Sequence, residues 1–430
     1  MEEQGNSHCK KDAVCPGTLL SMSRGKGNLL IIQGGGPTPV LNASLCAAID
    51  EARKERRALR ILGGLFGIHG LLRGQVLDLT DISESQLNLL QNTPGAALGT
   101  TRFKPDEQEL EQIVNQLASY DVRWLVVIGG NGSLTGAAAL SNAAHAIGYD
   151  LSVIGAPKTI DNDIAGTDRC PGYGSGARYV AQSVRDLGMD VRSLPQPVSI
   201  FEAMGRSVGW LAAAAALAKR DEFDAPHLIY LPEKPFSMDR FVADVDRIVS
   251  RQGWAIVVVN EGLRTANGQM VFEANNGEQN DALNRPLPGG VARFLAESAS
   301  RALKIRCRSE KPGLCGRASM LHVSEQDRAD AEIVGRQAVK AALEEYDGMM
   351  VALRPLEAGS EIQTELIPLA SIAGKDRGIP AQWLEDSDIA VGERFLKYAR
   401  PLVGELAVYS PPLAELALLV RDQSTVNQHA

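Results

Sequence analysis

Residues 157–168, with the sequence PKTIDNDIAGTD, place a lysine, a threonine and two aspartates in one short segment. Asp161 and Asp163 alternate about Asn162, so in an extended segment their side chains project to the same side. Two carboxylates this close need a cation, a metal ion or hydrogen bonds to stabilise them. In phosphoryl transfer, one aspartate accepts the proton of an attacking hydroxyl, the other helps to hold Mg²⁺, and Lys158 neutralises charge on the transferred group. The alternative is an Asx-rich turn capped by its own side chains.

Two glycine-rich loops precede this segment. The first, GGG at 34–36, ends an apolar run and opens onto a helical pattern, where backbone N–H groups and the helix dipole can hold a phosphate. The second, IGGNGSLTGAA at 128–138, repeats this pattern, with Ser133 as the expected N-cap of the next helix. Neither loop matches the dinucleotide or the Walker motif. A tight turn would explain one loop, but two loops at neighbouring strand ends favour phosphate binding.

Alternating strands and helices are predicted to position these loops. Strands are predicted at 29–33, 58–62, 124–130, 151–157, 197–203, 227–232, 255–262 and 348–353. Stretches with helical periodicity separate them, the last two at about 288–303 and 325–345. This order predicts βαβ units. We therefore expect two Rossmann-like, three-layer α/β domains with mostly parallel sheets and the active site in the cleft between them.

Composition argues against several classes of function. The formal net charge of −8, without a run of basic residues, disfavours nucleic-acid binding. The apolar step near the N-terminus is too short for a signal sequence or a membrane span. The six cysteines include no C-x-x-C pair, so free thiols in a reducing cytoplasm are expected rather than a zinc or redox site. We expect a cytoplasmic protein that binds small molecules, without nucleic-acid or membrane partners.

Five motifs, in this order, resemble the phosphofructokinase superfamily of bacterial ATP-dependent and pyrophosphate-dependent enzymes. They are GGxxPxxN (Gly35, Gly36, Pro39, Asn42), GGNGS at 129–133, PKTIDND at 157–163, EAMGR at 202–206 and VNEG at 259–262. The resemblance spans about residues 28–403. It implies transfer of a phosphoryl group from ATP to the 1-hydroxyl of fructose 6-phosphate, with Mg²⁺ bridging the donor phosphates.

The resemblance also implies a role for each matching residue. Asp161 corresponds to the general base, Lys158 and Arg102 to catalytic cations, and Asn131 and Asp163 to metal-associated positions. Donor contacts are implied for Gly35, Gly36, Arg102, Gly130, Asn131, Gly132 and Ser133. Acceptor contacts are implied for Thr159, Asp163, Met204, Gly205, Arg206, Glu261, Arg308 and Arg317. Some of the family's arginines enter from a neighbouring subunit, so a homodimer or homotetramer is implied.

The resemblance divides the chain as follows. Residues 1–27 are expected to be a flexible extension. Residues 28–172 are expected to form the donor-phosphate domain, completed by about 316–346. Residues 173–315 are expected to form the sugar-phosphate domain, completed by about 347–421.

Three positions depart from the family pattern. Asn131 replaces the aspartate of GGDGS, Pro197 stands where many members have a sugar-phosphate arginine, and Leu314 where many have a histidine. A related sugar phosphate or polyol therefore stays open as the acceptor.

A non-catalytic paralogue that binds metabolites is less favoured because Asp161 is retained. A kinase of the NAD or lipid type shares a similar glycine loop, but the TIDND and MGR motifs argue against it.

Two residues bear on whether the phosphoryl donor is ATP or pyrophosphate, and they favour different donors. Gly132 leaves room for a nucleotide, whereas pyrophosphate users usually place an aspartate there. Lys158, by contrast, is the residue that pyrophosphate users carry. The steric argument favours ATP, with a pyrophosphate-dependent fructose 6-phosphate phosphotransferase as the alternative.

Overall fold

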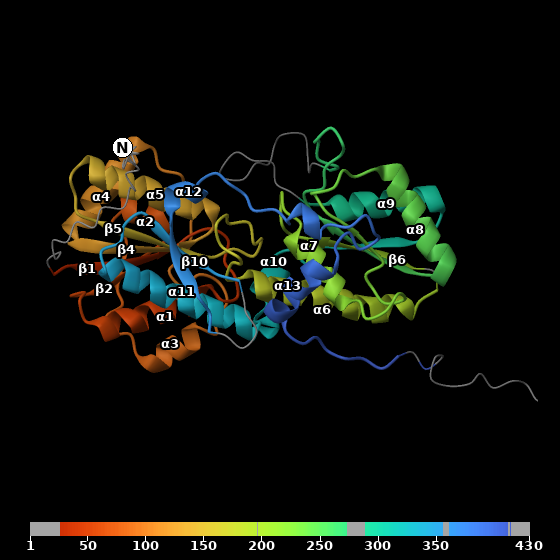
Figure 1. Cartoon of the computed structure of the whole chain (residues 1–430), viewed down its shortest axis with the longest axis horizontal. Helices are drawn as coiled ribbons and strands as arrows, with labels where there is room; N and C mark the ends of the chain where they lie inside the picture. Colours follow the sequence, from red (N-terminus) through yellow and green to blue (C-terminus); the bar gives the residue numbers. More distant parts are fainter. Residues whose placement is uncertain (1–25, 196, 273–288, 356–360, 412, 414–430) are drawn as a thin grey trace, which may run out of the picture.

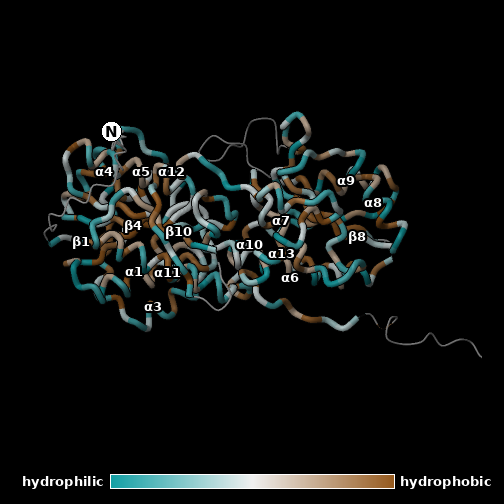
Figure 2. Tube along the Cα trace, in the orientation of Figure 1, coloured by the Kyte–Doolittle hydropathy of each residue, from teal (hydrophilic) through white to brown (hydrophobic). Residues whose placement is uncertain are grey.

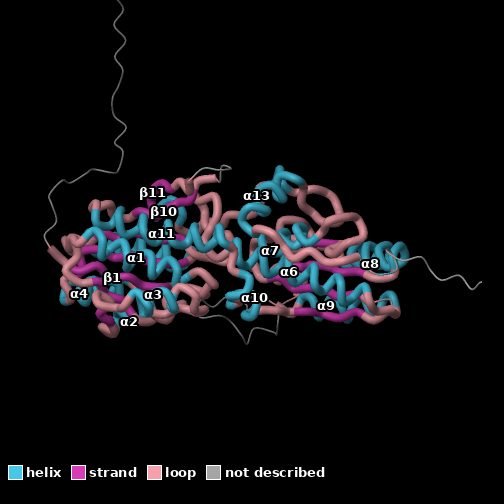
Figure 3. Tube along the Cα trace, turned by 90° about the horizontal axis from the view of Figure 1, so that it is seen from below, coloured by secondary structure: helices cyan, strands magenta, loops and turns pink. Residues whose placement is uncertain are grey.

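The computed structural model describes residues 26–195, 197–272, 289–355, 361–411 and 413. The predicted N-terminal extension at 1–27 therefore lies outside the described residues, apart from residues 26 and 27. Figure 1 shows two α/β domains side by side, and the view in Figure 3 agrees, with α10 (Leu314–Ala318) between them. Every helix in the described part is too short or too polar to cross a membrane.

The first domain is built on a seven-stranded sheet with the order β11-β10-β5-β4-β1-β2-β3. Its strands are β1 (Asn28–Gln33), β2 (Ile61–Gly64), β3 (Val76–Asp78), β4 (Val122–Gly129), β5 (Ser152–Pro157), β10 (Met349–Leu353) and β11 (Thr364–Pro368). The five central strands run parallel, and the edge strands β3 and β11 are antiparallel. The central strands are continuous apolar runs because helices cover both faces of the sheet.

Two layers of helices cover this sheet. One face carries α1 (Leu41–Glu55), α3 (Glu84–Leu90) and α11 (Glu325–Leu343). The other face carries α2 (Gly67–Leu72), α4 (Glu107–Ser119), α5 (Asn131–Ala146) and α12 (Leu369–Ile372). Figure 2 shows hydrophobic residues concentrated in the sheet between these layers.

The second domain is smaller, with a four-stranded parallel sheet in the order β7-β8-β6-β9. The strands are β6 (Val198–Ala203), β7 (Leu228–Tyr230), β8 (Ala255–Asn260) and β9 (Cys307–Glu310). One face packs on α6 (Tyr173–Arg192), α7 (Trp210–Ala214) and α13 (Glu393–Val403), and the other on α8 (Met238–Gln252) and α9 (Val291–Leu303). The fold confirms the prediction of two α/β domains with mostly parallel sheets.

Several sequence predictions need correction. Residues 347–421 were expected to complete the second domain, and α13 does pack on its sheet. However, β10 pairs with β5 and β11 pairs with β10, so both strands extend the large sheet. Ser133 is not a helix cap, because α5 begins at Asn131 and Gly130 is its N-cap residue. The short strands β3, β9 and β11 were not predicted.

Candidate active site

A cavity of about 850 Å³ lies where the carboxyl ends of β1, β4 and β5 face those of β6 and β8. Loops that follow parallel strands meet at one edge of a sheet, which brings motifs from distant parts of the chain together. Of the residues predicted for the site, the cavity is lined by Gly35, Gly36, Arg102, Gly130, Asn131, Gly132, Ser133, Lys158, Thr159, Asp161, Asp163, Met204, Arg206, Glu261 and Arg317.

The two glycine loops pack tightly on each other at one end of this cavity. A Cβ atom on Gly34 or Gly129 would collide with the Ser133 side chain. Gly35 has a φ of +76°, a conformation that residues with a side chain rarely adopt. The loops thus leave backbone N–H groups at the start of α5 free of bulky side chains, as a phosphate site requires.

Three basic side chains gather beside the same loops. Lys158 is only 2% exposed, and its Nζ donates a hydrogen bond to the Gly36 carbonyl at 2.6 Å. Burial, assisted by the charge of Arg317, lowers the pKa of Lys158 to about 8. The Arg317 NH1 lies 2.8 Å from where a Cβ of Gly36 would be, and burial and the nearby Arg102 lower the Arg317 pKa. Arg317, predicted to contact the sugar phosphate, thus lies with the donor-loop residues.

The aspartate segment is a turn rather than the extended segment that we predicted. Asn162 has a φ of +57° and is fully buried. Its Oδ1 accepts a hydrogen bond from the Cys170 N–H at 3.0 Å, and its Nδ2 donates to the Tyr398 hydroxyl at 2.9 Å. Asp161 and Asp163 therefore flank a residue whose side chain is anchored in the protein.

Asp161 has the environment of a general base. Its Oδ1 is buried and has no hydrogen-bond partner among the described residues. Burial and the negative charges of Asp163 and Glu261 raise its pKa, while Arg206 and Lys158 oppose the increase. A carboxylate with a raised pKa accepts a proton more readily near neutral pH.

Asp163 lies beside Asn131 and beside the carboxylate of Asp376, which was not predicted from the sequence. The Asn131 Nδ2 is 3.0 Å from Asp163 Oδ2, 3.2 Å from the Asp163 carbonyl and 3.2 Å from Asp376 Oδ1. Burial is the main cause of a raised Asp163 pKa, and Asp376 adds to it. Asp376 is 245 residues from Asn131 in the chain, and no local motif marks it.

These oxygens fit a magnesium ion. Asp163 Oδ1 and Asn131 Oδ1 are both buried without a hydrogen-bond partner in the described part of the chain. No group of three or more acidic, His or Cys side chains suited to a metal occurs among the described residues. Mg²⁺ does not require one, because it is usually held by one or two carboxylates together with substrate phosphates and water.

The opposite side of the cavity is formed by the Met204–Gly205–Arg206 turn. Gly205 and Arg206 have φ values of 140° and 49°, and a Cβ on Gly205 would lie 2.5 Å from the Val208 carbonyl. Glu261 Oε1 accepts hydrogen bonds from both backbone N–H groups at 3.3 Å. Gly205 itself does not line the cavity; it permits the turn that places Arg206 there.

Arg308 is not brought to this cavity. It lies on β9, level with Ser199 near the amino end of β6, and Pro197 precedes that same strand end. Lys311, which was not predicted, lines the cavity instead, and its Nζ is 3.3 Å from Glu202 Oε1. The departure Leu314 does line the cavity.

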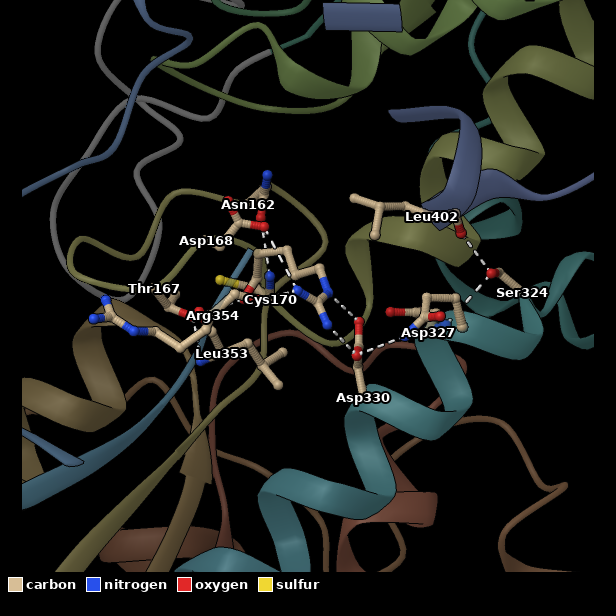
Figure 4. Close-up of polar contacts among 12 residues, drawn as sticks. Asn162, Thr167, Asp168, Cys170, Ser324, Asp327, Asp330, Leu353, Arg354 and Leu402 are labelled. Atoms are coloured by element: carbon tan, nitrogen blue, oxygen red, sulfur yellow. Dashed lines mark hydrogen bonds and ion pairs between the residues drawn. The ribbon is translucent and has the colours of Figure 1, made fainter. Parts of the chain in front are cut away.

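A buried polar network fastens the aspartate turn to α11 (Figure 4). Arg169 makes a two-point ion pair with Asp330, Nε to Oδ2 at 2.6 Å and NH2 to Oδ1 at 2.7 Å. Asp327, one turn earlier on α11, accepts hydrogen bonds from the backbone N–H groups of Gly172 and Ser175 at 2.7 and 3.0 Å. The chain on both sides of Cys170 is therefore held by carboxylates of one helix.

The sequence model described as Phosphofructokinase matches residues 28–342. The chain belongs to the phosphofructokinase family. This confirms the resemblance in the sequence, and the protein is a phosphotransferase of the phosphofructokinase type.

Relatives of this phosphofructokinase with different donors are known. Pyrophosphate–fructose 6-phosphate 1-phosphotransferases from Xanthomonas campestris and Rhodospirillum rubrum are 38% and 36% identical, each over 88% of this chain, and 91% and 95% of their own lengths are covered. An ATP-dependent 6-phosphofructokinase from Amycolatopsis methanolica is 33% identical over 62% of this chain and 58% of its own length. The solved structure of a pyrophosphate-dependent phosphofructokinase from Marinobacter aquaeolei is 30% identical, with a TM-score of 0.79 over 89% of this chain and 92% of that one.

Proposed function

We propose that this phosphofructokinase is a pyrophosphate-dependent fructose 6-phosphate 1-phosphotransferase. The observation that carries the proposal is the buried Lys158 ammonium, held 2.6 Å from the Gly36 carbonyl inside the donor loop. Together with Arg102 and Arg317 it concentrates positive charge on a small region. Electrostatic attraction to these three cations stabilises a compact polyanion such as pyrophosphate. The nucleoside part of ATP carries no negative charge and gains nothing from them.

The proposal reverses the donor preferred from the sequence. A Cβ on Gly132 would meet nothing within 4 Å, so the space for a nucleotide remains and ATP is the alternative donor. Open space permits a nucleotide but does not attract one. The positioned lysine, and the similarity over 88% of the chain to relatives named for pyrophosphate, support pyrophosphate instead.

In the proposed reaction, Asp161 accepts the proton of the sugar 1-hydroxyl as the hydroxyl oxygen attacks one phosphorus of pyrophosphate. The bond from that phosphorus to the bridging oxygen breaks, and orthophosphate leaves. Lys158, Arg102 and Arg317 stabilise negative charge on the transferred phosphoryl group. Arg206 contacts the acceptor, and Glu261 fixes the turn that carries it. Mg²⁺, when bound near Asp163 and Asn131, neutralises charge on the donor phosphates.

A homodimer or homotetramer in the cytoplasm is part of the proposal. Arg308 lies outside the cavity of its own chain, which supports the expectation that some acceptor arginines enter from a neighbouring subunit. Sedimentation of the purified protein tests this, and a monomer that is active at assay concentration would contradict it.

The donor is tested with purified protein, Mg²⁺ and fructose 6-phosphate, with pyrophosphate and ATP supplied in parallel. We expect kcat/KM to be at least about 100-fold higher with pyrophosphate, corresponding to about 3 kcal/mol of transition-state stabilisation. A higher value with ATP would refute the donor assignment. If neither donor gave product, fructose 6-phosphate would be wrong as the acceptor, and other sugar phosphates and polyols would be compared.

A further inference from the structure

Asp376 lies beside the active site, in the segment of the chain that leads from the large sheet to the second domain. This segment is fixed in place: the Arg377 N–H donates to the Asp163 carbonyl at 2.8 Å, and Asp376 forms a β-bridge with Ile164. The Arg377 guanidinium lies 4.3 Å from the centre of the Trp210 ring, and the Trp210 indole N–H donates to the Arg377 carbonyl at 2.9 Å. The backbone on both sides of the Asp376 carboxylate is thus held.

The carboxylate of Asp376 links the two domains. Its Oδ1 lies 3.2 Å from Asn131 Nδ2 in the first domain, and its Oδ2 accepts a hydrogen bond from the Ser207 hydroxyl at 3.0 Å in the second. Ser207 directly follows Arg206. The side chain therefore contacts both domains, beside the cavity-lining residue Asn131, although Asp376 is not itself among the residues that line the cavity.

One amide nitrogen faces more acceptors than it can satisfy. Asn131 Nδ2 has two hydrogens, but three oxygens lie within 3.2 Å of it: the Asp163 carbonyl, Asp163 Oδ2 and Asp376 Oδ1. The Asn131 Oδ1 and Asp163 Oδ1 atoms are buried without partners among the described residues. Two carboxylates thus share one uncharged amide that cannot donate to all three oxygens.

A divalent cation would bind the acceptor oxygens that Asn131 Nδ2 cannot satisfy, and it would also give the two unpartnered Oδ1 atoms an ion to bind. Oxygen atoms of carboxylates, carbonyls and amides are the ligands that Mg²⁺ and Mn²⁺ prefer. Rotating the Asn131 amide by half a turn directs its Oδ1 toward the two carboxylates, and a cation among the oxygens then replaces the amide hydrogens. The Asp376 side chain is solvent-exposed, so this carboxylate is open to an incoming ion.

We propose that Asp376 is a ligand of the active-site divalent cation and supplies the carboxylate that position 131 lacks in this chain. The inference rests on the proposed function only for the presence of Mg²⁺. Its test contains neither donor nor acceptor, so failure here is distinguishable from a wrong substrate assignment.

The test is a titration of the full-length protein with Mn²⁺ alone, with free Mn²⁺ followed by electron paramagnetic resonance. We expect Asp376→Asn to weaken Mn²⁺ binding at least tenfold. Ser207→Ala is the matched control: it removes the other hydrogen bond of the Asp376 carboxylate but should leave the affinity within about twofold. Circular dichroism checks that each variant is folded. Unchanged affinity in Asp376→Asn, or no Mn²⁺ binding by the native protein, would overturn the proposal.

A double-mutant cycle tests the compensation between positions 131 and 376. Asn131→Asp should tighten Mn²⁺ binding, and adding Asp376→Asn to that variant should then weaken binding less than it does in the native protein. Residues that supply ligands to one ion are coupled, so their effects are not additive. Equal losses in both backgrounds would show that Asp376 does not replace a carboxylate at 131.

Discussion

The Arg169 guanidinium and the Asp330 carboxylate form a buried two-point ion pair, with side chains 2% and 3% exposed. Arg169 follows the aspartate turn, and Asp330 belongs to α11, which packs on the large sheet (Figure 4). Without the Asp330 carboxylate, the buried Arg169 keeps Asp168 as a charged partner, whose Oδ2 lies 3.5 Å from Arg169 NH1. The position of the turn therefore depends on a helix far away in the sequence.

Asp330→Asn should lower the free energy of unfolding by about 3 kcal/mol, the lower end of the range for breaking a buried ion pair, because Asp168 still partly offsets the Arg169 charge. Urea unfolding measures the loss. The control is Glu297→Gln, which breaks the exposed Arg293–Glu297 pair and should cost less than about 1 kcal/mol. Similar losses in the two variants would contradict the assigned importance of the buried pair.

Asp161→Asn should reduce kcat by about 10²–10⁴-fold, the range associated with a positioned general base. The fold should persist, because burial raises the pKa of Asp161 and so already disfavours its charged form. Steady-state kinetics and thermal unfolding check the two halves of this prediction. A variant with native kcat would remove Asp161 as the base.

Lys158→Met should lower kcat/KM for pyrophosphate by about 100-fold or more, as loss of a preorganised transition-state cation does. Turnover with ATP should fall less. Lys104→Met is the matched control, since Lys104 also lines the cavity but is exposed. Equal losses for both donors would mean that Lys158 does not discriminate between them.

The buried His227 should make stability sensitive to acid. Its Nδ1 accepts a hydrogen bond from the Ile256 N–H at 2.9 Å, and burial lowers its pKa from 6.5 to about 4. The folded state thus favours the neutral ring. The contribution of His227 to the free energy of unfolding is therefore fully present above about pH 6.5 and is lost as the pH falls toward 4.

At about 1.4 kcal/mol per pKa unit, the His227 contribution amounts to about 3 kcal/mol. Urea unfolding at pH 7 and pH 4.5 measures it, and comparison with His227→Asn separates it from other titrating groups. Burial raises the pKa of Asp327 to about 6, so protonation of Asp327 stabilises the folded state as the pH falls. This effect is the same in the native protein and in His227→Asn, and the comparison removes it. An identical pH dependence in the two proteins would refute the prediction.

Local patterns predicted the central strands well. The runs at 29–33, 124–130 and 151–157 correspond to β1, β4 and β5, because a strand covered on both faces must be apolar throughout. The strands that were missed, β3, β9 and β11, are edge strands of three to five residues with partly exposed side chains. Short edge strands carry neither a long apolar run nor a clear alternation.

The sequence by itself determined the family, the two α/β domains and the residues that follow the strands, including Lys158 and Asp161, because these depend on local periodicity and short motifs. Only the tertiary structure decided which sheet β10 and β11 join, that Arg317 lies against the donor loop, and that Asp376 reaches Asn131. Those relationships depend on where edge strands pair and where the chain crosses between domains. Such long-range contacts form through packing of surfaces distant in the sequence, and no local pattern encodes them.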